Sequence, residues 1–85
     1  MKIGYKPSFI KQYSGLEPSL REEAKEKIEA FRSKANYKQL KVHKLKGELS
    51  DFYSFSVNYR YRIIFTYLSP KEVVLLAIGD HEIYK

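Results

Sequence analysis

The chain of 85 residues has no cysteine and no tryptophan. Without cysteine it can form neither a disulfide framework nor any site that needs a thiolate. A reducing cytoplasm is the natural location for such a chain, and it is the location we expect. The longest apolar run, residues 73–78, has six residues, whereas a membrane-spanning helix needs about 20. The first residues contain no apolar signal-peptide segment, so we expect neither membrane insertion nor export.

Positive charge is in excess, with 16 Lys and Arg against 10 Asp and Glu, a formal net charge of +6. A field of this sign attracts polyanions such as RNA, DNA, the ribosome or an acidic protein, without choosing among them. The apolar share of 44% is typical of a folded chain rather than a disordered one. The length fits a single small domain over residues 1–85.

Residues 2–16 predict a strand followed by a helix. Residues 2–6 alternate in polarity, which is typical of a strand. Ser8 can cap a helix that begins after it, and Gly15 weakens the end of that helix. The apolar side of this helix consists of Phe9, Ile10, Tyr13 and Leu16.

A second helix is predicted from Pro18 to about Lys34, since proline is tolerated in a first helical turn. Ser19 and Glu22 have the spacing of a capping box. One apolar stripe follows at steps of four and three residues, formed by Leu20, Ala24, Ile28, Phe31 and Ala35. The opposite side is charged, and we interpret it as a solvated face stabilised by pairs four residues apart.

The remainder of the chain predicts strands. Residues 51–57 and 60–67 alternate between apolar and polar side chains and are separated by a turn at Asn58. Residues 72–79 are apolar on both faces, which places this strand inside the sheet. The order is therefore β-α-α-β-β-β, with a short polar tail over residues 80–85. We expect an α+β fold in which two N-terminal helices pack on one face of a mostly antiparallel sheet.

A basic segment separates the second helix from these strands. No acidic residue lies between Glu29 and Glu48. The segment instead carries His43 and six basic residues: Arg32, Lys34, Lys38, Lys41, Lys44 and Lys46. Lysines neutralise phosphates and release counterions, so a run of one sign predicts contact with a nucleic-acid backbone. A solubilising linker is the alternative interpretation.

The strand alternation also predicts a polar sheet face on the side away from the helices. Its members are Ser54, Ser56, Arg60 and Arg62. A buried face would not tolerate two arginines, so this face is either open or binds a ligand. Guanidinium groups suit phosphates because they present a planar fork of donors.

The C-terminal tail combines groups that can exchange protons. After Gly79 come Asp80, His81, Glu82 and Tyr84. Histidine changes protonation near neutral pH, which suits acid–base catalysis, although a lone histidine in a tail is commonly a surface residue. His43 and His81 are the only histidines, and no spacing around them is a known metal-ligand motif. We therefore expect no metal site.

Four stretches of the sequence resemble one family. They are HKLKGEL from His43, YSFSV from Tyr53, YRIIF from Tyr61 and LAIGDHEIY from Leu76. With the length and the element order, they resemble the RelE/ParE superfamily of bacterial toxins, the toxin halves of type II toxin–antitoxin pairs. The resemblance covers nearly the whole chain. It implies an endoribonuclease that cuts mRNA in the ribosomal A site without a metal or cofactor.

The resemblance also implies roles for single residues. Arg62 matches the family's strand arginine, which steadies the scissile phosphate and its developing charge. His81 lies where the YoeB and YafQ branches use a histidine as general acid, and Tyr84 resembles a C-terminal tyrosine that stacks on or orients the substrate. His43 lies near a histidine of the YafQ branch. The RNA-binding surface is expected to include Lys41, Lys44, Lys46, Ser54, Ser56 and Arg60.

The sequence departs from the family pattern on the middle strand. Ser54 and Ser56 stand where the RelE branch carries lysines. Ser56 and Arg60 stand at about the places of a further histidine and aspartate of the YafQ branch. The nearest interpretation is a histidine-type ribonuclease of this superfamily whose general base is either His43 or Glu48.

Two other functions stay open on the sequence alone. The ParE branch shares the fold but poisons DNA gyrase and needs no nuclease site, and a non-catalytic binding module is the second alternative. As a toxin, the protein is expected to be a monomer when alone and to act on mRNA at the ribosome. Its antitoxin is expected to be small and partly disordered, with an acidic or apolar helix that covers the basic sheet face.

Overall fold

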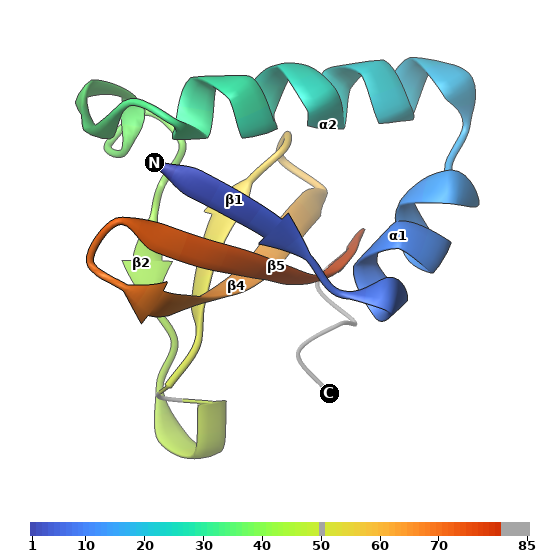
Figure 1. Cartoon of the computed structure of the whole chain (residues 1–85). Coiled ribbons are helices and arrows are strands. Elements are labelled where there is room, and N and C mark those ends of the chain that lie inside the picture. Colours follow the sequence, from blue (N-terminus) through green and yellow to red (C-terminus); the bar gives the residue numbers. More distant parts are fainter. Residues whose placement is uncertain (50, 81–85) are drawn as a thin grey trace.

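The computed structural model describes residues 1–49 and 51–80, and Figure 1 shows how their helices and strands are arranged. In chain order the elements are β1 (Lys2–Tyr5), α1 (Pro7–Ser14), α2 (Pro18–Phe31), the 3-10 turn η1 (Lys34–Asn36), β2 (His43–Lys44), the 3-10 turn η2 (Gly47–Leu49), β3 (Tyr53–Ser56), β4 (Tyr61–Ser69) and β5 (Glu72–Asp80). No helix in these two ranges is both long and apolar enough to cross a membrane.

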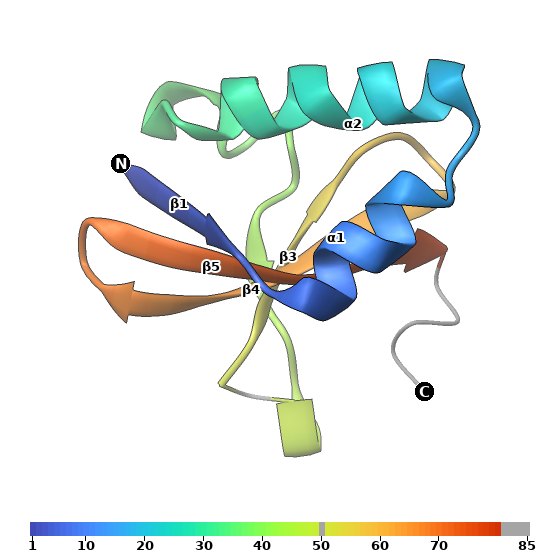
Figure 2. The ribbon, with the colours of Figure 1, turned by 45° about the vertical axis from the view of Figure 1, so that its right-hand side comes forward.

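The five strands form one sheet in the order β1-β5-β4-β3-β2. β1 runs parallel to β5, and the other neighbouring strands are antiparallel. β5 therefore has a strand on each side, as its apolar sequence predicted. α2 crosses over the sheet and α1 lies beside β5 (Figures 1 and 2). The predicted α+β architecture is confirmed, and β2 is an additional short strand.

Both helices pack on the same side of the sheet and share one hydrophobic core with it. Phe9 of α1 and Phe31 of α2 are buried together with Phe55 and Phe65 of the sheet. The centroid of the Phe31 ring lies 4.3 Å from that of Phe55 and 4.7 Å from that of Phe65. Aromatic pairs of this kind stabilise a core beyond the area that they bury. Much of the aromatic content of the sequence is therefore structural.

The end of α2 differs from the prediction. The apolar stripe through Phe31 faces the core, but the helix stops at that residue and Ala35 is exposed. Ser33 has an extended backbone with φ −107° and ψ 123°. The Asn36 amide donates a hydrogen bond to the Ala30 carbonyl at 2.8 Å. Because a side chain satisfies this terminal carbonyl, a further α-helical turn is not needed, and the alanine at the periodic position lies in the 3-10 turn η1 instead of in α2.

The predicted serine caps do not form at either helix. α1 and α2 begin at Pro7 and Pro18, and neither start has a side-chain cap hydrogen bond. Ser8 Oγ instead donates to a β5 carbonyl oxygen at 2.8 Å, and so ties α1 to the sheet. The capping box predicted from Ser19 and Glu22 is also wrong. Proline in the first position has no N–H and has a preset φ, which favours a helix start without a side-chain cap.

The sheet face away from the helices is less open than predicted. β2 pairs with β3 through His43 and Ser54, so that Ser54 lies between β2 and β4. Ser54 is 0% exposed, and Ile64, its partner on β4, is 7% exposed. The prediction of an accessible, RNA-contacting side chain is therefore wrong at Ser54. β2 has only two residues and no periodic pattern, so nothing in the sequence indicated this extra neighbour.

Candidate functional site

A cavity of about 400 Å³ lies beside β2 and β4, on the sheet face away from the helices. It is lined by His43, Leu45, Lys46, Leu49 and Arg62. Three residues predicted from the sequence as site residues, His43, Lys46 and Arg62, thus line one surface hollow. An imidazole, an ammonium and a guanidinium at one place form a group of proton-exchanging and phosphate-binding side chains.

Strand register explains why His43 and Arg62 share a face. His43 lies opposite Ser54, and Arg62 lies opposite Ser56. Partners directly opposite each other in a sheet point to the same side, and residues two apart on one strand also share a side. The two candidate side chains therefore lie on one face although 19 positions of the sequence separate residues 43 and 62.

Arg62 is held in place by the turn that precedes β4. Its Nη1 donates to the carbonyl oxygen of Asn58 at 2.8 Å and to that of Tyr61 at 3.3 Å. Within the described chain, both hydrogen bonds of the Arg62 side chain use this one nitrogen. A guanidinium has five N–H donors, so the group can be oriented by the turn and still present a fork of donors to an anion.

Asn58 organises the same turn and was not recognised in the sequence as a site residue. Its Oδ1 accepts from the backbone N–H of Arg60 at 2.9 Å and of Tyr61 at 2.8 Å. Its Nδ2 donates to Glu23 Oε1 on α2 at 2.7 Å. Asn58 therefore fixes the β3–β4 turn, anchors it to a helix and supplies the carbonyl that holds Arg62. An asparagine between two strands predicts a turn, but not this link to the helix.

Lys41, two residues before β2, orients the ring of His43. Nδ1 lies 2.8 Å from the Lys41 carbonyl oxygen, which can only accept, so Nδ1 carries the proton of the neutral ring. Nε2 then holds the lone pair and can act as a base. Lys41 has φ 58°, in the left-handed region that is costly for a residue with a side chain. This backbone conformation turns the Lys41 carbonyl toward the imidazole.

The other predicted site residues are distributed over different surfaces. Lys44 follows His43 on β2, so its side chain points to the opposite face of the sheet. Lys41 and Ser56 line a second cavity. Arg60 lies over the Tyr61 ring, with its guanidinium carbon 5.7 Å from the ring centroid. The remaining two predictions, His81 and Tyr84, lie outside the described residues.

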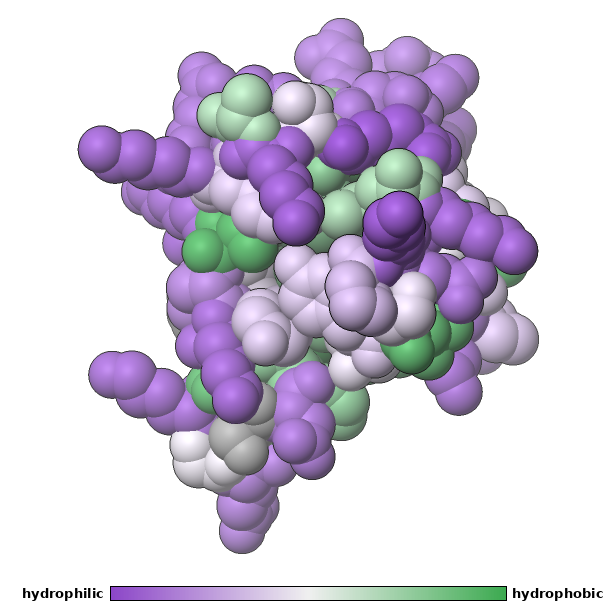
Figure 3. Space-filling model, turned by 60° about the vertical axis from the view of Figure 1, so that its left-hand side comes forward, coloured by the Kyte–Doolittle hydropathy of each residue, from purple (hydrophilic) through white to green (hydrophobic). Residues whose placement is uncertain are grey.

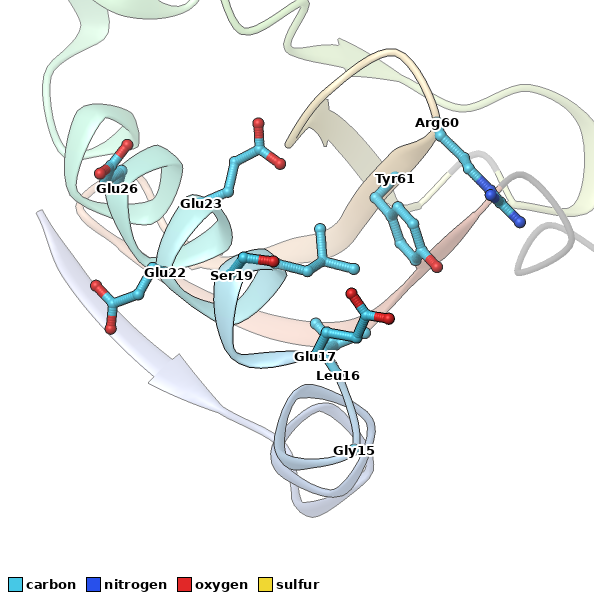
Figure 4. Close-up of a pocket in the computed structure, with 10 residues that line it drawn as sticks. Gly15, Leu16, Glu17, Ser19, Glu22, Glu23, Glu26, Arg60 and Tyr61 are labelled. Atoms are coloured by element: carbon cyan, nitrogen blue, oxygen red, sulfur yellow. The ribbon is translucent and has the colours of Figure 1, made fainter.

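A larger cavity, of about 780 Å³, has the opposite character. It lies where the α1–α2 turn, α2 and the start of β4 meet, and it is lined by four glutamates: Glu17, Glu22, Glu23 and Glu26. Figure 4 shows the Arg60 guanidinium directed away from Glu23 and Glu26. A cavity with this charge repels phosphate, so its size does not make it the nucleic-acid site.

Hydrophilic side chains dominate the face drawn in Figure 3, several of them extended into solvent, and hydrophobic groups form small separate patches. In the described ranges, four large hydrophobic residues are well exposed: Tyr5, Ile10, Tyr59 and Leu68. Tyr59, in the β3–β4 turn, is the most exposed of them at 92%. It lines one cavity together with polar residues such as Lys27 and Lys41, so it is part of a polar surface rather than of an apolar patch.

The fold also occurs in proteins of known structure. HP0894 from Helicobacter pylori is 25% identical, with 96% of each chain covered and a TM-score of 0.68. A chain of the YoeB–YefM complex from Staphylococcus aureus is 18% identical, with 95% of this chain and 97% of that chain covered and a TM-score of 0.73. YafQ from Escherichia coli is 14% identical, with 98% and 96% covered and a TM-score of 0.73. Among curated proteins, none matches the sequence.

A family assignment comes from the sequence itself. Residues 18–85 match the ParE-like toxin domain, which is well over half of the chain. The matched range contains His43, Lys46 and Arg62, the polar groups of the cavity beside β2. The chain therefore belongs to the ParE-like toxin domain family, within the RelE/ParE superfamily that its motifs resemble.

Proposed function

We propose that this protein is the toxin of a type II toxin–antitoxin pair and a metal-independent endoribonuclease that cuts mRNA on the ribosome. The observation that carries the proposal is the cavity in which His43, Lys46 and Arg62 meet. A surface that only binds gyrase does not require an imidazole whose Nδ1 is hydrogen-bonded, as in His43, next to a guanidinium whose position is fixed by hydrogen bonds, as in Arg62. Both features serve phosphodiester cleavage.

The reaction is attack of an RNA 2′-hydroxyl on the adjacent phosphorus. The new bond joins O2′ to phosphorus, the bond from phosphorus to O5′ breaks, and the products are a 2′,3′-cyclic phosphate and a 5′-hydroxyl. Arg62 binds the non-bridging oxygens and stabilises the charge that develops on them. His43 Nε2 removes the 2′-hydroxyl proton. In this proposal His81 donates a proton to the leaving O5′, and Tyr84 orients the substrate.

His43 is preferred over Glu48 as the general base. His43 lines the cavity with Arg62, and its proton-bearing nitrogen is occupied by the Lys41 carbonyl. Glu48 lies in η2, is exposed and does not line that cavity. A base must come within hydrogen-bond reach of the proton that it removes, and geometry is the first criterion. Lys46, which does line the cavity, is proposed to bind a neighbouring phosphate.

Primer extension on a defined mRNA in a purified translation reaction tests the proposal. The wild type should cut only when ribosomes are present, and Arg62→Ala and His81→Ala should each abolish the cuts. Lys71→Ala, which removes an exposed positive charge at the β4–β5 turn, is the matched control and should cut normally. Intact mRNA with wild-type protein would contradict the proposal, and inhibition of gyrase supercoiling in the same preparation would then support the ParE-like function.

A cognate antitoxin is part of the proposal. One of the similar structures is a YoeB–YefM toxin–antitoxin complex, and this chain presents a basic, partly open sheet face around Arg62. We propose that an acidic or apolar antitoxin segment covers this face and excludes RNA from it. The toxin alone is proposed to be a monomer in the cytoplasm.

A further inference from the structure

A second basic cavity, of about 320 Å³, lies between α2, the segment before β2 and the β3–β4 turn. Its polar lining residues are Lys27, Gln39, Lys41, Ser56, Asn58 and Tyr59. They come from three separate parts of the chain, so only the fold assembles them. We call this cavity the Tyr59 pocket.

Tyr59 has an unusual position for a large aromatic side chain. It is 92% exposed at the edge of the cavity, whereas the phenylalanines of the core are almost fully buried. Leaving such a ring in water forgoes the gain from burying it. A free, flat ring beside positive charge is the arrangement on which bases of single-stranded nucleic acids stack.

The charge of the Tyr59 pocket favours a phosphate. Lys27 and Lys41 both line it, and no carboxylate is among its lining residues. Glu23, one turn before Lys27 on α2, has its carboxylate engaged by the Asn58 amide at 2.7 Å. The other glutamates of that helix segment, Glu22 and Glu26, line the acidic cavity instead. The pocket is therefore a cationic site next to an acidic one.

The Tyr59 pocket and the cavity around Arg62 have no lining residue in common, but two contacts link their walls. Lys41 lines the pocket, and its carbonyl accepts the hydrogen bond from His43 of the neighbouring cavity. Ser56 also lines the pocket, and it lies directly opposite Arg62 in the sheet. A polymer with one phosphate at Arg62 can therefore continue past His43 to Lys41 and Tyr59.

We propose that the Tyr59 pocket binds a nucleotide of single-stranded RNA that flanks the nucleotide held at Arg62. The base stacks on the Tyr59 ring, and the phosphate lies between Lys27 and Lys41. Stacking of this kind tolerates any base, so the pocket contributes affinity and strand direction rather than sequence preference. The identity of the natural strand as mRNA rests on the proposed function, but the binding chemistry does not.

Direct binding tests this proposal without any cleavage. The full chain is titrated with a fluorescein-labelled RNA 8-mer whose 2′-hydroxyls are methylated, a probe that cannot be cut, and Kd is measured at several salt concentrations. Tyr59→Ala should raise Kd by about 5- to 100-fold, the range for loss of one base stack. Tyr59→Phe keeps the ring and should stay within about twofold of wild type. Lys27→Gln with Lys41→Gln should lower the slope of log K against log salt by roughly 0.7, the contribution of the one phosphate that they hold.

The controls remove similar groups elsewhere. Leu68→Ala deletes another exposed apolar side chain, and Lys71→Gln deletes another exposed charge, both at the β4–β5 end of the molecule, so neither should change Kd. Circular dichroism checks that each variant is folded. An unchanged Kd for Tyr59→Ala, or an equal loss for Tyr59→Phe, would overturn the stacking role. A polyglutamate peptide that binds with the same dependence on Tyr59 would overturn the RNA assignment in favour of an acidic protein.

The outcome is separable from that of the proposed function. If mRNA is never cut but the methylated RNA binds through Tyr59, the nuclease assignment fails and the pocket stands. If mRNA is cut normally by Tyr59→Ala and the methylated RNA binds it as it binds wild type, the pocket fails and the nuclease stands.

Discussion

The acidic cavity at the start of α2 and the basic cavity beside β2 differ in size and in chemistry. The acidic cavity is nearly twice as large, about 780 Å³ against about 400 Å³, and four glutamates line it. The basic cavity is smaller and holds His43, Lys46 and Arg62. The comparison teaches that donor type and charge are better guides to a proposed phosphate site than cavity volume, on a chain of net charge +6.

Replacing one arginine by alanine at each of the two cavities should show the largest difference between them. Arg62→Ala should lower the rate of ribosome-dependent cleavage by about 10²- to 10³-fold, because it removes the donors that stabilise the developing phosphorane charge. Arg60→Ala, two residues away beside the acidic cavity, should change that rate by less than about threefold. Single-turnover primer extension measures both rates. Equal losses in the two variants would show that charge alone, and not the position at the basic cavity, is responsible.

Asn58 joins the two cavities, so its substitution should affect the basic one from a distance. Asn58→Ala removes three hydrogen bonds, one of them to Glu23 in the acidic cavity. We expect a loss of about 2 kcal/mol in the free energy of unfolding and about tenfold slower cleavage, because the turn that holds Arg62 loosens.

Urea unfolding and cleavage kinetics measure these two effects. Glu23→Gln is the matched control, since its amide oxygen can still accept from Asn58. The Glu23→Gln variant should keep most of the free energy of unfolding and most of the cleavage rate. A cleavage rate that falls with Glu23→Gln as far as with Asn58→Ala would mean that the charge of Glu23, and not the hydrogen bond, supports the site.

Neutralising one charge in each cavity should have smaller and opposite effects on RNA affinity. Lys46→Gln should weaken binding of an uncleavable single-stranded RNA by a few-fold and lower its salt slope by roughly 0.7, the contribution of one phosphate contact. Glu26→Gln removes a negative charge from the acidic cavity, so it should leave the slope unchanged and raise affinity slightly at low salt. Fluorescence titrations from 50 mM to 200 mM salt measure both slopes. A lower slope for Glu26→Gln would place RNA in the acidic cavity.

The aromatic core at the end of α2, where Tyr37 stacks on Phe31, should make the stability depend on alkaline pH. Burial raises the pKa of the Tyr37 phenol to about 12, and the neighbouring Tyr67 adds to the rise. Folding therefore favours the protonated phenol, and its stabilising contribution is complete below pH 10 and is lost as the pH rises from 10 to 12. Tyr37→Phe should remove this part of the alkaline loss. Measuring the free energy of unfolding against pH for the wild type and for Tyr37→Phe tests this expectation. Parallel curves for the two proteins would contradict the assignment of the alkaline loss to Tyr37.

The strand pattern predicted the orientation of Arg62 correctly because strand alternation is a local property. The period of two along residues 60–67 predicted that Arg62 points away from the core, and the structure has it there. The apolar stripe of α2 was predictable for the same reason, since its period of 3.6 is set by the backbone. The resemblance to the RelE/ParE superfamily rested on such local stretches, and the match over residues 18–85 supports it.

Other features depend on individual side-chain contacts and strand pairings and could not be predicted. The end of α2 is fixed by Asn36 reaching back to Ala30, so Ala35 leaves the helix although its spacing fits. Ser54 is buried because β2 pairs beside it, and Lys44 faces away from His43 because β2 is a strand. The amide of Asn58 reaches Glu23 across 35 positions of the chain. None of these contacts has a periodic signature.

The sequence by itself determined the composition, the excess of positive charge, the α+β element order and the faces of its longer strands. These follow from residue types and from backbone periods, which act over a few neighbouring residues. Only the tertiary structure decided that His43 and Arg62 meet at one cavity, that four glutamates gather at another, and that Tyr59 stays in water beside two lysines. The physical reason is that strand pairing and turn hydrogen bonds set these distances, and both join residues far apart in the chain.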